Sequence, residues 1–373
     1  MSRRTTGGPG TLAARALAMS GPLWQAALAR THPADPGPYG PLGAPGQHGV
    51  ALPAGFDCRV VARSGHKVAG IVWHSAPAGG ACFPDDDGWI YVSNSEASLL
   101  GGVSAVRFGP GGRIGSAYRI LSGTNFNGAG CATPWHTWLS CEEILCGRVF
   151  ECDPYGMEAA MPRLVMGCFK HDAIACDPDH HVVYLTEDEP DGCFYRFVPD
   201  DWGDTTTGTL EVLVCPPGAA GPVSWKRVPS PAALVEPTRL QVAGARHFNC
   251  GASCHYADGV CYFATTGDGR VWAYDVDDGR VEEAGGLGDL IARLSGDLFV
   301  ARADESLGDQ GPGTDRGVGI DVVTGDGVAA PFLRVTGDAA AEVTGPAFSP
   351  DGRHLYFSSR LGTTYEVTGP FRS

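Results

Sequence analysis

The sequence predicts an all-β protein, a six-bladed β-propeller with four-stranded blades, and three observations lead to that prediction. A strand pattern of aromatic and aliphatic residues ending in a small residue recurs six times along the 373 residues. A second apolar run, which opens with glycine, follows each copy after a turn. Only 18% of the residues are charged, whereas glycine numbers 54 and proline 28, a composition that favours many short strands over a bundle of helices.

The strands can be assigned in chain order. The first pattern occupies residues 89–93, 136–140, 182–186, 260–264, 297–301 and 354–358. The second pattern occupies residues 102–108, 147–150, 192–197, 269–274, 317–320 and 362–367. A further strand is expected upstream of several copies, at 173–178, 253–259 and 345–352, and a fourth downstream, at 117–121, 163–166, 210–214 and 332–335. Four antiparallel strands repeated in this way are the blade of a propeller.

The ring of blades must close, and the N-terminal part of the chain supplies the closing strand. Residues 56–61 carry apolar side chains at Phe56, Cys58, Val60 and Val61 and precede the first blade, so we expect them to form the fourth strand of the last blade. Closure leaves no open sheet edge for another chain to pair with. A pair of β-sandwiches is the alternative, but six copies in one phase argue against it. We therefore expect residues 51–373 to form a single propeller.

Residues 1–50 are rich in alanine, glycine and proline and have no sustained strand pattern. Arg3 and Arg4, followed by an apolar stretch, resemble a degenerate twin-arginine export signal, but Arg15 interrupts that stretch. The interruption favours a cytoplasmic protein, with twin-arginine export as the alternative. No run of about 18 apolar residues is present, so we expect no transmembrane helix.

The charge of the chain narrows the classes of partner. Lys and Arg number 27 against 42 Asp and Glu, a formal net charge of −15. Nucleic acids and anionic membrane surfaces require clustered basic residues, so neither is expected as a partner. We expect a small-molecule ligand and no obligate protein partner. The 13 cysteines are odd in number and lack zinc-ribbon spacing, which indicates reduced and mostly buried thiols.

Acidic residues recur in the loops that enter the first strand or leave the second strand of a blade. In a propeller these loops meet at one mouth of the central channel. A ring of carboxylates repels itself unless protons or cations neutralise it, and its oxygen ligands suit Ca²⁺. The alternative is that the acids cap strand ends or face solvent. The candidate metal ligands are Glu96, Glu142, Glu187, Asp188 and Glu342.

Two histidines are candidates for proton transfer. His171 adjoins Asp172, and a neighbouring carboxylate orients an imidazole and favours its charged form. We therefore name His171 and Asp172 as candidate catalytic residues, with His136 as a second proton carrier. A structural role is the alternative for His136.

Polar residues near the same loops are candidates for binding a substrate. They are Asn94, His74 and His255, although His74 and His255 also suit structural roles. Three thiols lie nearby, but no helix N-terminus or basic cluster is evident to lower their pKa, so a nucleophilic thiol is not expected. These thiols are Cys131, Cys250 and Cys254.

Motifs along nearly the whole chain resemble the PhoX family of bacterial alkaline phosphatases. They occupy residues 39–42, 52–56, 72–74, 89–96, 133–143, 169–172, 184–188, 271–272 and 344–352. The resemblance implies a six-bladed propeller whose channel mouth holds calcium and iron ions and hydrolyses phosphate esters. In such a site the metals polarise the phosphoryl oxygens and bind the nucleophile.

The departures from the family pattern fall at the expected chemistry. The metal-binding cysteine of the family corresponds to Gly128, while Cys131 lies three residues on, and a family carboxylate corresponds to Ala252. A further position, which is acidic in the family pattern, is occupied by Arg302 in this sequence. These changes shift the site by about three units of charge towards positive if Arg302 faces it, which argues against iron and leaves Ca²⁺ as the cofactor to consider.

Three functions follow from these residues. The first is a small-molecule enzyme in a remodelled pocket that acts on an anionic metabolite, in the manner of a specialised-metabolite tailoring enzyme. Arg302 would bind the anionic group through a bidentate pair, and His171 or His136 would move protons. The second is a phosphate-ester hydrolase that uses Ca²⁺ held by the acids named above. The third is a non-catalytic binding propeller.

Overall fold

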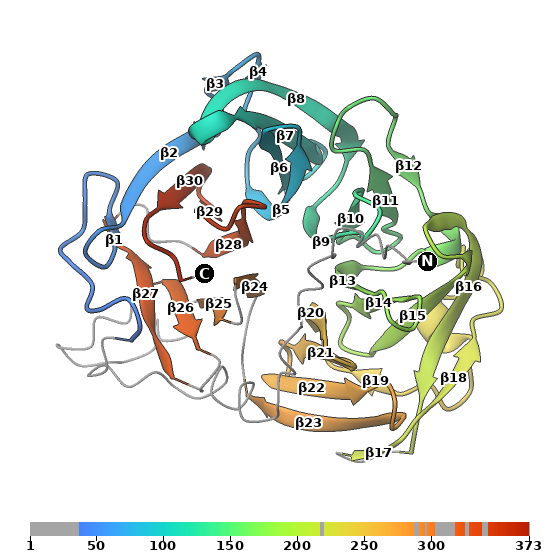
Figure 1. Cartoon of the computed structure of the whole chain (residues 1–373). Helices are drawn as coiled ribbons and strands as arrows, with labels where there is room; N and C mark the ends of the chain where they lie inside the picture. The colour runs from blue at the N-terminus through green and yellow to red at the C-terminus, as the bar shows by residue number, and fades with distance from the viewer. Residues whose placement is uncertain are drawn as a thin grey trace, which may run out of the picture.

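The chain forms six antiparallel β-sheets arranged as blades around a central channel, which confirms the predicted six-bladed propeller (Figure 1). The computed structural model describes residues 37–216, 220–286, 291–294, 297–302, 318–324, 328–337 and 342–372. Of residues 220, 285, 286, 291–294 and 302 it describes the backbone alone. The blades follow one another around the ring in sequence order, so loops far apart in the chain lie side by side.

Each of the first three blades begins with its innermost strand and adds its further strands outward in chain order. Blade 1 contains β5 (Pro77–Asp85), β6 (Gly88–Ser95), β7 (Gly101–Gly109) and β8 (Arg113–Thr124). Blade 2 contains β9 (Asn127–Ala132), β10 (Trp138–Glu142), β11 (Val149–Cys152) and β12 (Met161–Pro162). Blade 3 contains β13 (His171–Asp177), β14 (Val182–Glu187), β15 (Gly192–Asp201), β16 (Asp204–Val214) and β18 (Ser224–Arg227).

The last three blades each take their outermost strand from an earlier part of the chain. Blade 4 contains β20 (Gly251–Ala257), β21 (Val260–Thr265), β22 (Arg270–Asp275), β23 (Arg280–Gly286) and outermost β17 (Ala220–Pro222). Blade 5 contains β24 (Ile291–Leu294), β25 (Asp297–Arg302), β26 (Gly319–Val323), β27 (Ala329–Val335) and outermost β1 (Val50–Ala51). Blade 6 contains β28 (Val343–Phe348), β29 (His354–Ser359), β30 (Thr363–Thr368) and outermost β2 (Asp57–Arg63).

The N-terminal strand closes the ring as predicted. Strand β2 pairs with β30 from Asp57 opposite Thr368 to Arg63 opposite Thr363. An ion pair between Arg59 of β2 and the buried carboxylate of Glu366 in β30 stabilises this pairing. The short β1 adds a second closure on blade 5, which the sequence did not predict because two residues carry no strand pattern.

One predicted strand is wrong. Residues 163–166 were expected as the fourth strand of blade 2, but residues Leu164–Met166 form a 3₁₀ turn, η2, after the two-residue β12. Met166 is buried in the same apolar cluster as Leu210 of blade 3. Packing against the next blade therefore replaced pairing with β11.

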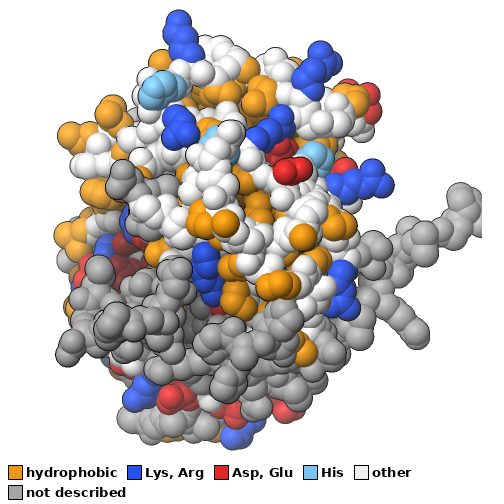
Figure 2. Space-filling view, turned by 90° about the vertical axis from the view of Figure 1, so that its left-hand side faces the viewer, with side chains coloured by type: hydrophobic (Ala, Val, Ile, Leu, Met, Phe, Trp, Pro, Cys, Tyr) orange, Lys and Arg blue, Asp and Glu red, His pale blue; other side chains and the backbone are white. Residues whose placement is uncertain are grey.

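The remaining short elements stand outside the strand order of the blades, although residues 247–248 pair with β15 of blade 3. They are β3 (Lys67–Val68), β4 (Ile71–Val72), β19 (His247–Phe248), η1 (Pro110–Gly112) and η3 (Thr238–Leu240). None of the helices in the described part of the chain is long and apolar enough to cross a bilayer. On the flank drawn in Figure 2, Lys and Arg side chains stand apart from one another among hydrophobic and uncharged ones.

The core lies between neighbouring blades because both faces of each sheet are apolar. The rings of Phe194 in blade 3 and Phe263 in blade 4 stack with centroids 4.1 Å apart. Near the channel the innermost strands approach closely: a Cβ on Gly79 would lie 2.9 Å from the Cα of Ala129. Glycine at this position allows β5 and β9 to converge on the channel.

Candidate functional site

Charged side chains from four blades meet at one end of the channel. Arg360, which follows β29 of blade 6, pairs with Glu342 of the same blade and with Glu96, which follows β6 of blade 1. Lys170, which precedes β13 of blade 3, pairs with Asp188 after β14 and lies 3.3 Å from Glu143 after β10 of blade 2. Each cation thus bridges carboxylates that belong to two adjacent blades.

Asp172 completes this group, which we call the mouth cluster. Its carboxylate is half-buried and makes no hydrogen bond with any residue that the structure describes. Burial first, and then the negative charges of Glu143, Asp188 and Glu96, raise the pKa of Asp172 well above its usual range. The mouth cluster consists of Glu96, Glu143, Lys170, Asp172, Asp188, Glu342 and Arg360.

Glu96 is the second acid of the cluster with an altered pKa. Its side chain is 11% exposed. Burial raises the pKa of Glu96 to about 7, although its partner Arg360 acts in the opposite direction. Glu96 therefore exchanges its proton near neutral pH, which suits a group that donates or accepts a proton in a reaction.

Two of the predicted metal ligands lie inside the blades instead of at the mouth. Glu187 is fully buried and accepts hydrogen bonds from the Tyr195 hydroxyl at 2.7 Å, the Cys193 amide at 3.1 Å and Arg239 at 3.0 Å. Glu142 is buried and accepts a hydrogen bond from the backbone amide of Asn125 at 3.0 Å. Both carboxylates therefore accept hydrogen bonds from the surrounding fold. This structural role is the alternative that the sequence left open.

Two predicted histidines are also interior. The ring of His171 is buried, packs on Phe169 with centroids 3.7 Å apart and lies 3.2 Å from the carbonyl of Gly167. The ring of His74 lies 2.8 Å from the Ser104 hydroxyl. Burial lowers the pKa of each histidine to about 3, so both rings are neutral at physiological pH.

Asn94 joins blades 1 and 2. Its amide nitrogen donates to the carbonyls of Gly128 and Ala129 at 2.8 and 2.9 Å. Its amide oxygen accepts from the Trp138 indole at 2.8 Å and from the Ser140 hydroxyl at 3.0 Å. All of its hydrogen-bonding capacity is used within the fold, which leaves none for a substrate.

The other predicted residues occupy three different places. His136 has a φ of 65° in the turn between β9 and β10, at the opposite end of blade 2 from Glu143. His255, in the middle of β20, lines the channel. Arg302 ends β25, where it pairs with Gly319, but its side chain lies outside the described residues.

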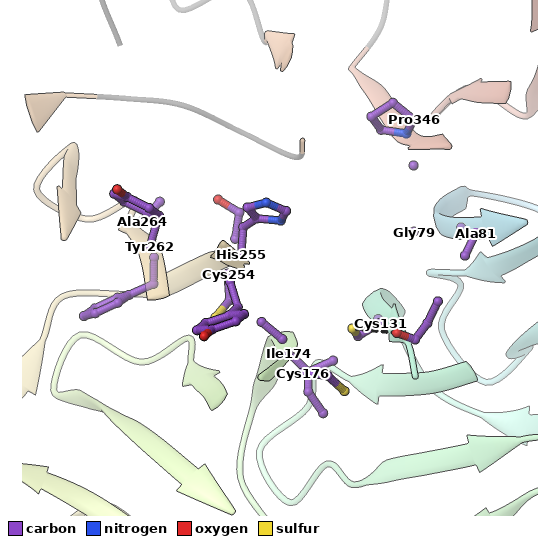
Figure 3. A pocket seen from close by; sticks show the side chains of 18 of the residues that line it. Gly79, Ala81, Cys131, Ile174, Cys176, Cys254, His255, Tyr262, Ala264 and Pro346 are labelled. Atoms are coloured by element: carbon purple, nitrogen blue, oxygen red, sulfur yellow. Dashed lines mark hydrogen bonds between the residues drawn. The ribbon is translucent and has the colours of Figure 1, made fainter. Parts of the chain in front are cut away.

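A cavity of about 350 Å³ occupies the channel between the innermost strands. Figure 3 shows the His255 side chain projecting into it, with Cys131 and Cys176 on neighbouring strands. A hydrogen bond from Cys176 lowers the pKa of Cys131, a perturbation that the sequence did not predict. The remaining wall is largely small or apolar, as with Gly79, Ala81, Ile174, Ala264 and Pro346. Such a cavity is large enough for a small organic molecule.

Three members of the mouth cluster are not among the site residues predicted from the sequence. Glu143, Lys170 and Arg360 each adjoin a loop that was recognised, and Lys170 lies within the motif at residues 169–172. The feature that could have indicated Lys170 and Arg360 is a basic residue at the end of a strand, close to loops that carry acidic residues. Only the arrangement of the blades shows which carboxylates such a cation reaches.

The fold and the site define a six-bladed propeller with a charged cluster at one mouth of its channel. A profile of the alkaline phosphatase PhoX family matches residues 86–297, more than half of the chain. The protein therefore belongs to the PhoX family, as its motifs indicated.

Solved structures share the fold at low sequence identity. PhoX of Pseudomonas fluorescens in complex with vanadate, a transition state analogue, matches with a TM-score of 0.70 and 15% identity, over 86% of this chain and 96% of that one. The gluconolactonase XC5397 of Xanthomonas campestris matches with a TM-score of 0.53 and 12% identity, over 89% and 99% of the two chains. No curated protein sequence matches the chain.

The residues present do not fit the calcium and iron cluster that the family implies. Within the described ranges, no group of three or more His, Cys, Asp or Glu side chains is arranged to hold a metal. Three of the predicted ligands, Glu96, Asp188 and Glu342, are paired with Arg360 or Lys170. We therefore derive no reaction step through a metal ion.

Proposed function

We propose that this protein is an enzyme that acts on an anionic small molecule at the channel mouth, by proton transfer involving Asp172 and Glu96. The observation that carries the proposal is the placement of these two acids, both with a raised pKa, beside the fixed cations Lys170 and Arg360. Sites that combine perturbed acids with charged binding groups are typical of catalytic centres.

Protonation of these two acids reduces the electrostatic repulsion that an anionic substrate meets at the mouth cluster. Fully ionised, its five carboxylates and two cations sum to −5 + 2 = −3. With Asp172 and Glu96 neutral, the sum is −3 + 2 = −1. The neutral acids then donate hydrogen bonds to an anionic group instead of repelling it, while Lys170 and Arg360 attract it.

The division of labour follows from this geometry. Arg360 and Lys170 orient the anionic group, and the channel cavity holds the rest of the substrate. Asp172, which has no hydrogen-bond partner among the described residues, gives a proton to the reacting group, and Glu96 exchanges a proton near pH 7. Arg302 is a further candidate for the anionic group. Specialised-metabolite tailoring in the cytoplasm is the setting that we propose.

Substrate profiling of Asp172→Asn tests the proposal. The purified full chain is screened against phosphate mono- and diesters, sugar lactones and carboxylate metabolites, with and without a chelator. We expect wild-type turnover that withstands chelation and falls by about 10²-fold or more in Asp172→Asn. Asp57→Asn, a change on the exposed β2, serves as the control and should retain full turnover.

The other outcomes identify the two alternatives. Phosphate-ester hydrolysis that a chelator abolishes and Ca²⁺ restores would establish the calcium-dependent hydrolase and contradict the proposal. Ligand binding without turnover would establish a non-catalytic propeller. Unchanged turnover in Asp172→Asn would remove that residue from the reaction.

A further inference from the structure

The carboxylates of the mouth cluster already have cations between them. Arg360 lies between Glu96 of blade 1 and Glu342 of blade 6, and Lys170 lies between Glu143 of blade 2 and Asp188 of blade 3. A cation that contacts two carboxylates from different blades relieves the repulsion that would otherwise separate the loops. A bound divalent ion performs the same electrostatic task in acidic sites.

The surroundings of Gly128 support this arrangement. A Cβ at Gly128 would lie 3.3 Å from the Oε2 of Glu143, so the carboxylate approaches the point from which a larger side chain would project. Glu143 in turn lies 3.3 Å from the Nζ of Lys170. The space beside Gly128 is thus used by a carboxylate that already has a protein cation as its partner.

At Ala252, likewise, an apolar side chain that packs in the fold stands where the family pattern has a carboxylate. Its side chain packs in a small apolar cluster with Ala264 and Val271. Ala264 and Val271 also line the channel. At the second position where the family pattern has a potential metal ligand, a methyl group therefore packs against two residues of the channel wall.

We infer that Arg360 and Lys170 are resident counter-cations that take the place of divalent ions, and that the mouth cluster becomes a Ca²⁺ site when both are neutralised. Four carboxylate side chains, two beside each cation, would then face one another without compensation. Carboxylate oxygens are the ligands that Ca²⁺ prefers, and their charge count sets its affinity. The inference concerns the same residues as the proposed reaction but does not depend on turnover.

Direct measurement of Ca²⁺ binding to the full chain tests this inference. The double variant Arg360→Gln/Lys170→Gln is titrated calorimetrically with calcium chloride beside the wild type, after dialysis and elemental analysis. We expect no calcium or iron retained by the wild type and a Kd for Ca²⁺ above about 1 mM. We expect the double variant to bind Ca²⁺ at least about tenfold more tightly, with a rise in its melting temperature on Ca²⁺ addition.

Matched variants keep the test specific to the mouth. Arg196→Gln removes a cation from the pair with Glu211 on the outer strands of blade 3, 2.7 Å apart, and should gain no Ca²⁺ affinity. Adding Glu96→Gln and Asp188→Asn to the double variant should abolish the gained binding. If the double variant does not fold, the single variants Arg360→Gln and Lys170→Gln are titrated in its place.

Two results would overturn the inference: one or more equivalents of calcium or iron retained by the dialysed wild type, or neutralised variants that bind Ca²⁺ no better than Arg196→Gln. Because binding is measured directly, an absence of catalytic turnover leaves this result unaffected, and Ca²⁺ binding by the variant leaves the proposed reaction to its own test.

Discussion

The interiors of the blades and the channel mouth use the same residue types in opposite ways. At three strand ends, consecutive polar residues divide between the two regions, with the first residue interior and the second at the mouth. The pairs are Glu142 and Glu143, His171 and Asp172, and Glu187 and Asp188. Successive side chains of a strand point to opposite sides, so only one residue of each pair reaches the channel.

The register of the sheets explains this division in blade 3. His171 and Glu187 are directly opposite each other in the pairing of β13 with β14. Both are therefore directed to the same side of the sheet and are buried there. Their neighbours Asp172 and Asp188 lie at the mouth. Position along the strand, more than residue type, therefore separates the buried structural acids from the acids at the mouth in this fold.

The greatest loss of stability is expected when the buried member of the pair Glu187 and Asp188 is replaced. Glu187→Ala leaves Arg239 and the Tyr195 hydroxyl without their shared acceptor inside the blade, and we expect it to destabilise the protein by about 3–5 kcal/mol. Asp188→Ala removes one of the two carboxylates beside Lys170, which keeps Glu143 as a partner. We expect a loss of stability below about 1 kcal/mol. Denaturant unfolding of both variants measures the difference, and equal losses would contradict the division.

A smaller effect concerns how Glu96 makes the stability of the protein depend on pH. The pKa of Glu96 in the folded protein, about 7, exceeds the ordinary value of 4.5 for a glutamate, so folding favours the protonated form. Stability is therefore greatest below the ordinary pKa and falls as the pH rises towards 7. Glu96→Gln removes this dependence, and we expect a stabilisation of about 1–3 kcal/mol at pH 8 that vanishes by pH 4. Thermal unfolding at both pH values checks the sign, and destabilisation at pH 8 would contradict it.

The smallest effect lies at the other end of blade 3. His180 lies 3.0 Å from the buried Asp177 and 3.2 Å from the exposed Asp277 of blade 4. Desolvation lowers the pKa of His180, but the two carboxylates outweigh it and raise the value above the usual 6.5. The stabilisation is therefore full below pH 6.5 and is lost as the pH rises through the folded pKa.

We expect His180→Gln to cost less than about 1 kcal/mol at pH 5.5, because the side chain is 35% exposed, and nothing at pH 9. Unfolding of wild type and variant at the two pH values measures this difference. A cost that is larger at pH 9 would show that the imidazole stabilises the interface between blades without its charge.

Much of the fold could be predicted because each blade repeats a pattern that local chemistry determines. Alternating apolar residues and turn glycines located the inner strands, and the apolar segment before blade 1 was recognised as the closing strand β2. The exceptions are segments with little local signal. Strand β1 has only two residues, and residues 163–166 look like a strand but form a turn that packs on blade 3.

The candidate site was predictable in its position and less so in its members. Glu96, Asp172, Asp188 and Glu342 do lie at the mouth, as their loop positions indicated. The partners that determine their chemistry, Arg360 and Lys170, come from separate blades. No local pattern indicates which carboxylates those two cations reach.

The number of blades, their strands and the end of the channel where polar residues collect could be inferred from the chain alone, because these features depend on periodicity and turn chemistry. The folded protein was needed to show which acids are buried, which share a cation and which can exchange protons. Those properties depend on distances between blades, and therefore on residues as far apart as Glu96 and Arg360.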